Sequence, residues 1–530
     1  MALADLHPDR DTRTETRTDT PTETGANTQP APQADAGSAA PLYQQLTERL
    51  TDAIRSGALR PGSRLTSVRQ AARDHQVSVA TVLLAYRQLE DAQLVRAVPK
   101  SGYFVASSPR ALLEPATSAP PPDALAVDVS SLSERVLQLA ADPQVVSFGT
   151  ACPAPDMYPQ ERIRRALSQA TLRQRALLVK YPLVPGEDAL RGAIARRALG
   201  MGCTLDPRDI VITNGCNESV RLCLQAVTKP GDTVALESPT SFGFLQILEA
   251  LHLKALEIPT HPRHGLSVDA LDLALQTQPV RALLAVPTLQ NPLGASMPLA
   301  ERRRLAQLLA RHQVPLIEDV IYNDLAERDE HRRAVKAFDT DGLVMLCGSH
   351  SKTVAPGLRI GWLEAGRFGT PVRRLKAALS GANTPVVEMA MADLLTQPGY
   401  EPHLRRLRQA IAPRIAEARA LIAEHFPRGT RVTDPQGGIM LWVELPTSVD
   451  SLLVFKACLD EGICVAPGTM FSATDRYRHC LRISVGSGWG DAQRLALRRV
   501  GVMVGVIVAG AGPSPSGAIA ITTANTAISA

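Results

Sequence analysis

The sequence lacks the features that would place the protein in a membrane or an oxidising compartment. No segment approaches the roughly 20 consecutive apolar residues of a membrane-spanning helix, and the nearest candidate, 501–510, has half that length. The N-terminus lacks the basic-then-apolar pattern of a secretory signal. The 8 cysteines are scattered singly with no CxxC pair, so neither a disulfide framework nor a metal site is expected. We therefore predict a cytoplasmic protein without a membrane partner.

Aromatic residues are scarce at 4%, but the chain of 530 residues is 45% hydrophobic, which is enough for a large core. Two segments have little apolar periodicity, and we expect a disordered tail at 1–40 and a low-complexity tail at 511–530. Residues 108–143 begin with a stretch rich in Pro, Ala and Ser and are predicted to be a linker. This linker would join a small module at 41–107 to a large body at 144–510.

The small module has the pattern of three helices followed by a hairpin. Leucine and isoleucine recur every fourth residue over 42–54, which predicts the first helix. A second, short helix follows Ser67, whose hydroxyl suits the N-cap position. The third helix begins near Ser78, and we expect its inner face to carry Val79, Val82, Leu83, Tyr86 and Leu89. Two apolar strands around the turn at 99–102 complete a winged helix-turn-helix.

The run LRPGSRLTSVRQAARDHQVSVATVLLAYRQLEDAQLVRAVPKSGYFV resembles the DNA-binding domain of GntR-type regulators. The resemblance implies double-stranded DNA as a partner, with the third helix in the major groove and the wing against the backbone or minor groove. It implies DNA contacts from the helices by Arg69, Ser78 and Thr81, and from the wing tip by Lys100, Ser101 and Gly102. Val79 and Leu83 stand where arginines often read DNA in the wider family, so readout of guanine by arginine is not expected at these two positions.

The large body alternates nearly all-apolar runs with amphipathic helices such as 299–312. Strand-like runs lie at 232–238, 282–287, 314–319 and 343–349. This alternation predicts an α/β fold with a mainly parallel sheet that is covered on both faces.

Polar residues follow several of these predicted strands. Asn291 and Asp319 are 28 residues apart, and Asp319 and Lys352 are 33 apart. Each separation is near the roughly 30 residues of one strand–helix–strand unit. Because ligands bind at the carboxyl ends of strands in open α/β sheets, we expect these groups to converge on one crevice.

The chemistry of the converging residues predicts a site for pyridoxal 5′-phosphate. A desolvated lysine flanked by cations can form a Schiff base with an aldehyde, which is the expected role of Lys352. Asp319 would keep the ring nitrogen protonated, and Tyr322 and Asn291 would hydrogen-bond the ring oxygen. The expected phosphate ligands are a guanidinium, two hydroxyls and the backbone at a helix N-terminus: Arg359, Ser349, Ser351, Gly215 and Cys216.

The motifs YPLVPGEDALR, TLQNPLG, IEDVIY, SHSKTVAPGLRIG and LRIS occur in this order and together resemble the class I branch of the fold-type I aminotransferases. The resemblance implies a homodimer in which Tyr181 reaches the phosphate of the neighbouring subunit, and it implies Arg482 as the clamp for an amino-acid carboxylate. Ser241 stands where an aromatic residue usually stacks on the cofactor ring. Phe242 is the candidate substitute, although on an extended segment it would point the other way.

A GntR-like winged helix joined to an aminotransferase-like body is similar to the MocR-type transcriptional regulators. The resemblance implies a regulator that senses pyridoxal phosphate or an amino-acid-like effector through the lysine site. Two alternatives stay open at this point. The first is a catalytically competent aminotransferase with a weak or vestigial DNA-binding domain. The second is a cofactor-free scaffold, which would require an exposed and unreactive Lys352.

Overall fold

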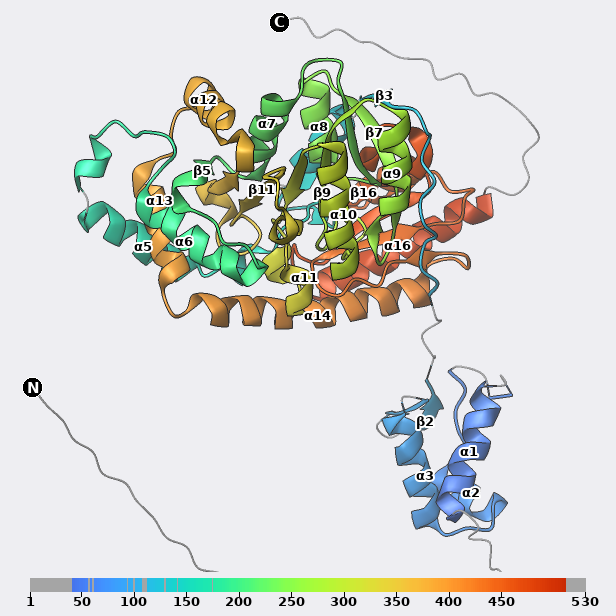
Figure 1. Ribbon diagram of the computed structural model, residues 1–530. Coiled ribbons are helices and arrows are strands. Elements are labelled where there is room, and N and C mark those ends of the chain that lie inside the picture. Colours follow the sequence, from blue (N-terminus) through green and yellow to red (C-terminus); the bar gives the residue numbers. More distant parts are fainter. Residues whose placement is uncertain are drawn as a thin grey trace, which may run out of the picture. The chain divides into compact units, whose positions relative to one another are not determined.

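The computed structural model describes residues 41–55, 58–59, 62–92, 94–98, 101–106, 112–127, 130–140, 142–173 and 175–510. The chain divides into two compact units, residues 1–108 and 109–530 (Figure 1). Both predicted tails and Lys100 lie outside the described residues. None of the helices in the described part of the chain has the length and apolar content that crossing a bilayer requires.

The first unit contains the predicted three helices and hairpin. Its elements are α1 (Leu42–Arg55), α2 (Val68–Asp74), α3 (Val79–Asp91), β1 (Val95–Val98) and β2 (Gly102–Val105). Ser67 and Ser78 are the N-caps of α2 and α3, and each hydroxyl accepts a hydrogen bond from the backbone N–H three residues on. Strands β1 and β2 pair antiparallel, and the Tyr86 hydroxyl donates to the carbonyl of Thr66 at 2.9 Å. The unit is therefore a winged helix-turn-helix.

The predicted inner face of α3 is wrong at two positions. Val79 and Leu83 are 47% and 37% exposed, whereas Val82 and Leu89 are fully buried. Val79 is the first residue of the helix, and Leu83 lies about 100° around the helix axis from Val82. The helix therefore presents two apolar side chains to solvent where the sequence pattern had placed them in the core.

The second unit is built on a mixed sheet with the strand order β3-β7-β6-β9-β10-β11-β12-β5, to which β8 adds at β7. The strands are β3 (Leu125–Ala126), β5 (Ile210–Thr213), β6 (Thr233–Ser238), β7 (Lys254–His261), β8 (Gly265–Leu266), β9 (Val280–Ala285), β10 (Leu316–Asp319), β11 (Val344–Ser349) and β12 (Gly361–Glu364). From β7 to β11 neighbouring strands are parallel, and β12 runs antiparallel to both of its neighbours. The predicted α/β fold with a mainly parallel sheet is confirmed.

Helices cover both faces of this sheet (Figure 1). The helices of this part of the chain, some of which pack on other helices, are α5 (Gln160–Arg173), α6 (Asp188–Ala198), α7 (Cys216–Val227), α8 (Phe242–Ala250), α9 (Val268–Thr277), α10 (Leu299–His312), α11 (Asp329–Arg332), α12 (Gly369–Leu379), α13 (Pro385–Thr396) and α14 (Tyr400–His425). Alternate residues of β6 enter different cores: Val234 and Leu236 pack in the cluster that contains α7, and Ala235 packs in the one that contains α10. Burial on both faces is the reason that these strands read as continuous apolar runs.

A smaller layer follows in sequence and adds an antiparallel sheet. It contains β13 (Arg431–Val432), β14 (Met440–Glu444), β16 (Ala466–Pro467) and β17 (Cys480–Ser484), with α15 (Ser451–Asp460) and α16 (Asp491–Gly510). A separate pair joins β15 (Ile463–Cys464) to β4 (Val146–Ser147). Within the predicted linker the structure also has β3 and a helix, α4 (Ser130–Ala140), which composition alone did not indicate.

Candidate functional site

A cavity of about 380 Å³ lies at the carboxyl ends of β10 and β11. Ten of the predicted site residues line it: Cys216, Phe242, Asn291, Asp319, Tyr322, Ser349, Ser351, Lys352, Arg359 and Arg482. Asp319 and Ser349 are the last residues of their strands, and Asn291 belongs to the loop that follows β9. The structure therefore brings together groups that are separated by up to 266 residues in the chain.

Lys352 is half-buried on the loop after β11, where its side chain borders the cavity. Burial is the largest cause that lowers the pKa of its ammonium group, and the guanidinium groups of Arg482 and Arg359 lower the pKa further. The thiol of Cys152 and the carboxylate of Asp319 act in the opposite direction. A lowered pKa increases the fraction of neutral amine, which is the nucleophilic form.

Asp319 lies at the base of the cavity and is 5% exposed. Burial raises the pKa of its carboxyl to about 6, against the lowering effect of a hydrogen bond from the backbone N–H of Ile321 at 2.8 Å and of one from the Cys216 thiol. A buried carboxylate in this position is stabilised by any cationic N–H placed opposite it.

One end of the cavity is suited to an anion. Gly215 is the N-cap of α7 with φ of 88°, and a Cβ atom at this position would collide with the Arg359 guanidinium. Ser349 and Ser351 lie next to each other with their Oγ atoms 2.8 Å apart. The tyrosyl hydroxyl of Tyr158 donates to the carbonyl of Ser351 at 2.9 Å, which fixes the loop that precedes Lys352. Free backbone N–H groups at a helix start, hydroxyls and a guanidinium are typical phosphate ligands.

Arg482 on β17 occupies another wall of the cavity and is 1% exposed. Its guanidinium donates to Oδ1 of Asn291 at 3.2 Å and to the carbonyl of Gly149. Its Nε is buried and has no hydrogen-bond partner among the described residues. Burial lowers the pKa of this guanidinium to about 10. A buried guanidinium that borders a cavity is suited to bind an oxyanion there.

Phe242 corrects an expectation about the segment after β6. The chain turns into helix α8 at this residue, with Ser241 as the N-cap, so the segment is not extended there. Both Ser241 and Phe242 line the cavity, and the Phe242 ring lies 5.7 Å from the guanidinium carbon of Arg482. The Oγ of Ser241 accepts a hydrogen bond from Asn291 at 3.2 Å.

Tyr181 lies apart from the other predicted site residues. It is 82% exposed and does not line the cavity. Several residues that do line it were missed, among them Thr150, Cys152 and Asn217. Thr150 and Cys152 belong to an irregular segment without periodicity, which carries no local signal of its place in the fold.

The predicted DNA-contact residues of the first unit lie at its surface. Arg69 on α2, Ser78 at the start of α3, and Ser101 and Gly102 at the wing are exposed, and Thr81 is partly buried. The Oγ atoms of Ser78 and Thr81 lie 2.8 Å apart, so both hydroxyls also stabilise the helix start. Arg64, which sequence reasoning missed, is exposed and pairs in a β-bridge with Phe104 beside the wing.

The comparisons with known proteins agree with both units. Residues 42–105 match the bacterial regulatory proteins of the gntR family, and residues 153–497 match aminotransferase class I and II. The chain is 38% identical over 467 residues to the uncharacterized HTH-type transcriptional regulator YjiR of Escherichia coli. This match covers 87% of this chain and 98% of that protein. It is 26% identical over 451 residues to the probable rhizopine catabolism regulatory protein MocR of Rhizobium meliloti, with 82% and 87% covered.

Among solved structures, the chain is similar to LysN, the α-aminoadipate aminotransferase of Thermus thermophilus, complexed with N-(5′-phosphopyridoxyl)-L-leucine. The TM-score is 0.66 at 25% sequence identity, and the match covers 72% of this chain and 96% of that one. The fold and the lysine-containing cavity therefore define a class I aminotransferase domain joined to a GntR-type DNA-binding domain. The chain belongs to the MocR-type transcriptional regulators.

Proposed function

We propose that this regulator binds pyridoxal 5′-phosphate in the cavity around Lys352. In this proposal the cofactor, or an amino-acid-like ligand that reacts with it, controls binding to double-stranded DNA. The observation that carries the proposal is the convergence of Lys352, Asp319 and Arg482 on one cavity, which Arg359 and Cys216 at the start of α7 also line. The similarity to LysN, solved with a phosphopyridoxyl amino acid, supports the same ligand class.

The residues fit the cofactor in charge and in hydrogen-bonding capacity. Arg359, Ser349, Ser351 and the N-terminus of α7 would hold its phosphate, and Asp319 would pair with its ring nitrogen. When bound, the cofactor supplies an aldehyde that an amine can attack and a ring that withdraws electrons. Lys352 contributes an amine whose lowered pKa favours the neutral form, and the Arg482 guanidinium, which lines the cavity, would bind a ligand carboxylate.

A homodimer is part of the proposal. Five large apolar side chains from the last turn of α5 to the segment before α6 are 57% to 88% exposed: Leu172, Leu178, Val179, Tyr181 and Leu183. An exposed apolar segment of this kind is typical of a surface that is covered by a partner. A second copy of the chain is the occupant that the family resemblance implies, with Tyr181 at the neighbouring site.

The linker has the contacts that a signal from the cavity to the DNA-binding unit would need. The backbone N–H of Ser118 donates to the carbonyl of Thr260, and the Thr260 N–H donates to the Ser118 hydroxyl at 2.8 Å. The backbone N–H of Val432 also donates to the carbonyl of Leu113. Residues 112–127 thus belong to the second unit and are hydrogen-bonded to its body. A displacement of Thr260 or Val432 would therefore move the linker.

A series of aromatic contacts joins the cavity to this linker. The Phe242 ring contacts Phe471 at 5.9 Å, Phe471 contacts Trp442 at 5.4 Å, and Trp442 contacts Tyr477 at 5.6 Å. Trp442 and Tyr477 line a small cavity beneath residues 115–119. Closely packed rings transmit displacement because they have little free volume. A ligand that displaces Phe242 would therefore disturb the linker.

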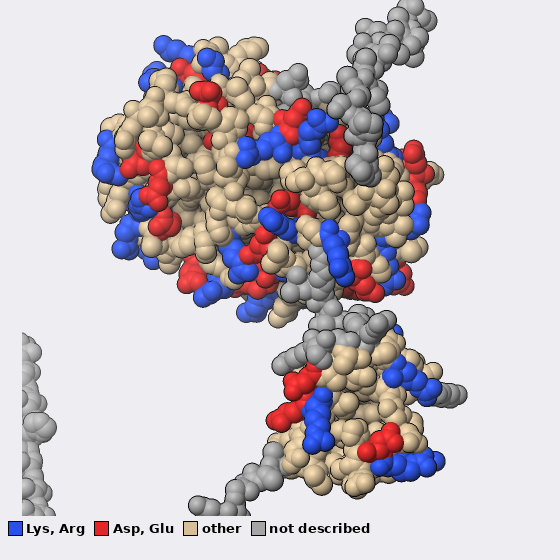
Figure 2. Space-filling view, turned by 90° about the vertical axis from the view of Figure 1, so that its right-hand side faces the viewer, with Lys and Arg blue, Asp and Glu red and all other residues tan. Residues whose placement is uncertain are grey.

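The alternative function is an aminotransferase whose DNA-binding domain is weak. Its support is the exposed apolar start of α3, where Val79 and Leu83 occupy positions that basic residues often hold in the wider family. Basic and acidic side chains are interspersed on the face of the second unit shown in Figure 2, so this face offers no continuous basic surface for DNA.

The two functions are separated by selection of genomic fragments, with and without pyridoxal phosphate, alongside assays of amino-group transfer from an amino acid to a 2-oxo acid. The proposal predicts sequence-selective binding whose affinity changes with the cofactor. Unselective binding that is indifferent to the cofactor, together with rapid transfer, would establish the alternative. A cofactor-free scaffold would show neither visible cofactor absorbance nor transfer.

A further inference from the structure

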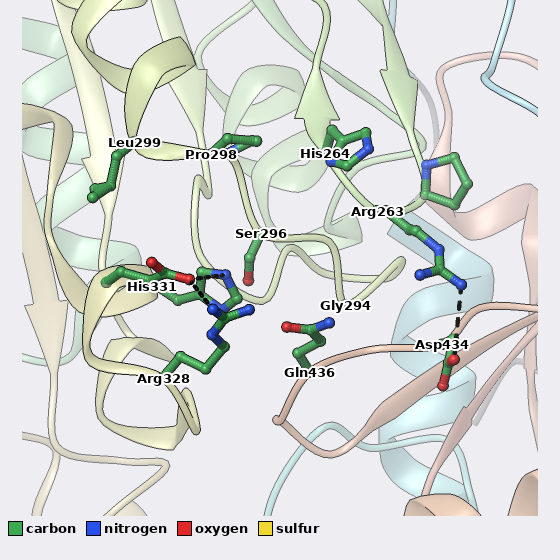
Figure 3. A pocket seen from close by; sticks show the side chains of 12 residues that line it. Arg263, His264, Gly294, Ser296, Pro298, Leu299, Arg328, His331, Asp434 and Gln436 are labelled. Carbon is green, nitrogen blue, oxygen red and sulfur yellow. Dashed lines mark ion pairs between the residues drawn. The ribbon is translucent and has the colours of Figure 1, made fainter. Parts of the chain in front are cut away.

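A second cavity of about 300 Å³ shares no lining residue with the cavity around Lys352 (Figure 3). Its walls come from the β7–β8 turn, the loop before α10, the segment at α11 and the loop between β13 and β14. A Cβ atom on Gly294 would lie 2.6 Å from Cβ of Pro435, so two of these loops are in close contact at the cavity. This volume suits a ligand about the size of an amino acid.

The charges of this second cavity are balanced rather than of one sign. Arg328 is paired with Glu330 at 2.8 Å, and Nη2 of Arg263 lies 3.8 Å from Asp434, beyond hydrogen-bond distance. Figure 3 shows the Arg328 and Gln436 side chains turned toward the same space. Guanidinium and amide donors suit a carboxylate, and the two carboxylates suit an ammonium group.

Polar atoms in the wall add to this arrangement. Nδ1 of His331 is buried and has no hydrogen-bond partner among the described residues, and burial lowers the pKa of this imidazole. The ring is therefore neutral near pH 7 and leaves the charge of the cavity unchanged. The hydroxyl of Ser296 accepts a hydrogen bond from Leu289 and retains its own proton for donation.

The cavity also borders the point where the linker is fixed. Nε of Arg263 donates to the carboxylate of Glu114, and the other oxygen of that carboxylate accepts from the backbone N–H of Asp434 at 3.1 Å. Glu114 lies on the linker, and Arg263 and Asp434 line the cavity. A ligand carboxylate that engages the Nη atoms of Arg263 would draw this guanidinium into the cavity and away from Glu114, which holds it through Nε.

We propose that this cavity is a second binding site, for a small zwitterion of amino-acid size, and that its occupation weakens the attachment of the linker at Glu114. The site is separate from the cavity around Lys352 and does not require the cofactor. It would let the protein respond to an amino acid that never reacts at the lysine.

The test uses the holoprotein after borohydride reduction, which leaves no carbonyl group in the first cavity for an amino acid to react with. The twenty common L-amino acids are titrated in turn by calorimetry. At least one is expected to bind with one site per chain, and analogues that lack its ammonium or its carboxylate should bind at least about tenfold more weakly. Loss of all binding after reduction would overturn the proposal.

Variants locate the site and test the link to the linker. Arg328→Ala should weaken binding about tenfold and Gln436→Ala a few-fold, whereas Arg281→Ala, an exposed arginine outside the cavity, should have no effect. Glu114→Gln should tighten binding a few-fold because Arg263 is then released, a result that a purely structural role does not predict. Unchanged affinity in Arg328→Ala would contradict the assignment. Because these variants can also be titrated without the cofactor, failure here is distinguishable from failure to bind pyridoxal phosphate.

Discussion

The two functional surfaces of this regulator are constructed in opposite ways. The cavity around Lys352 collects buried polar groups from segments far apart in the chain, and almost every one of them is constrained by a hydrogen bond or a neighbouring charge. The DNA-binding unit is made from one short stretch, and its candidate contact residues are exposed. The first surface depends on long-range packing, and the second depends on the local geometry of α3 and the wing. A substitution in the cavity should therefore change ligand binding, whereas one in the DNA-binding unit should change the stability of that unit or its affinity for DNA.

The strongest contrast is expected within α3 itself. Leu89 is fully buried and Leu83 is 37% exposed. Leu89→Ala should lower the free energy of unfolding of the DNA-binding unit by about 3 kcal/mol, because it leaves a cavity in the core. Leu83→Ala should change it by less than about 0.5 kcal/mol. Chemical denaturation of both variants measures the difference, and equal losses would contradict the orientation of α3.

In the cavity, the predicted effect falls on ligand binding. Arg482→Lys keeps the charge but loses the planar pair of donors, so the affinity for a substrate-like amino acid should fall about 10- to 100-fold. Cofactor absorbance should persist, because Arg482 is not among the expected phosphate ligands. Arg494→Lys, in the first turn of α16 and outside the cavity, is the matched control. A loss of cofactor in Arg482→Lys would show that this arginine supports the cofactor rather than the amino acid.

At the DNA-binding surface we expect a smaller and salt-dependent effect. Arg69→Ala should weaken binding to all DNA sequences about tenfold. It should also reduce the slope of log affinity against log salt concentration by about one, because one fewer phosphate contact releases one fewer counterion. Fluorescence anisotropy at several salt concentrations measures both quantities. Arg49→Ala, an exposed arginine on α1, serves as the control. An unaltered salt slope would place Arg69 outside the interface.

The smallest predicted effect concerns pH. The pKa of Asp319 is raised to about 6 in the cofactor-free protein, so the folded state holds a proton that the unfolded state releases at lower pH. The ordinary pKa of an aspartic acid side chain is near 4. The stability that the protonated Asp319 contributes is therefore lost as the pH rises from about 4 through the folded-state pKa of about 6. Relative to the wild type, Asp319→Asn should gain about 1 kcal/mol between pH 5 and pH 7. Denaturation at the two pH values tests this, and a gain in the reverse direction would contradict the burial of a neutral carboxyl.

Sequence reasoning performed well where the physical signal is local or regular. Strands buried on both faces give continuous apolar runs, and the intervals between Asn291, Asp319 and Lys352 match one strand–helix–strand unit, so their convergence could be predicted. Ser67 and Ser78 were identified as helix starts for the same local reason.

The errors arose where tertiary packing decides. The apolar pattern of α3 did not distinguish Val82 from Leu83, because both are apolar and the neighbouring elements determine which one is covered. Phe242 faces the cavity because α8 begins there, which the run of residues after β6 did not reveal. Thr150 and Cys152 reach the cavity from an irregular segment, and no periodicity marks such residues.

The most direct measurement is mass spectrometry of the borohydride-treated holoprotein. If the cavity binds pyridoxal phosphate as proposed, a phosphopyridoxyl group will be found on the ε-nitrogen of Lys352, and Lys352→Ala will carry none. A folded protein that is saturated with the vitamer, yet has an unmodified Lys352 after reduction, would contradict the proposal at its centre.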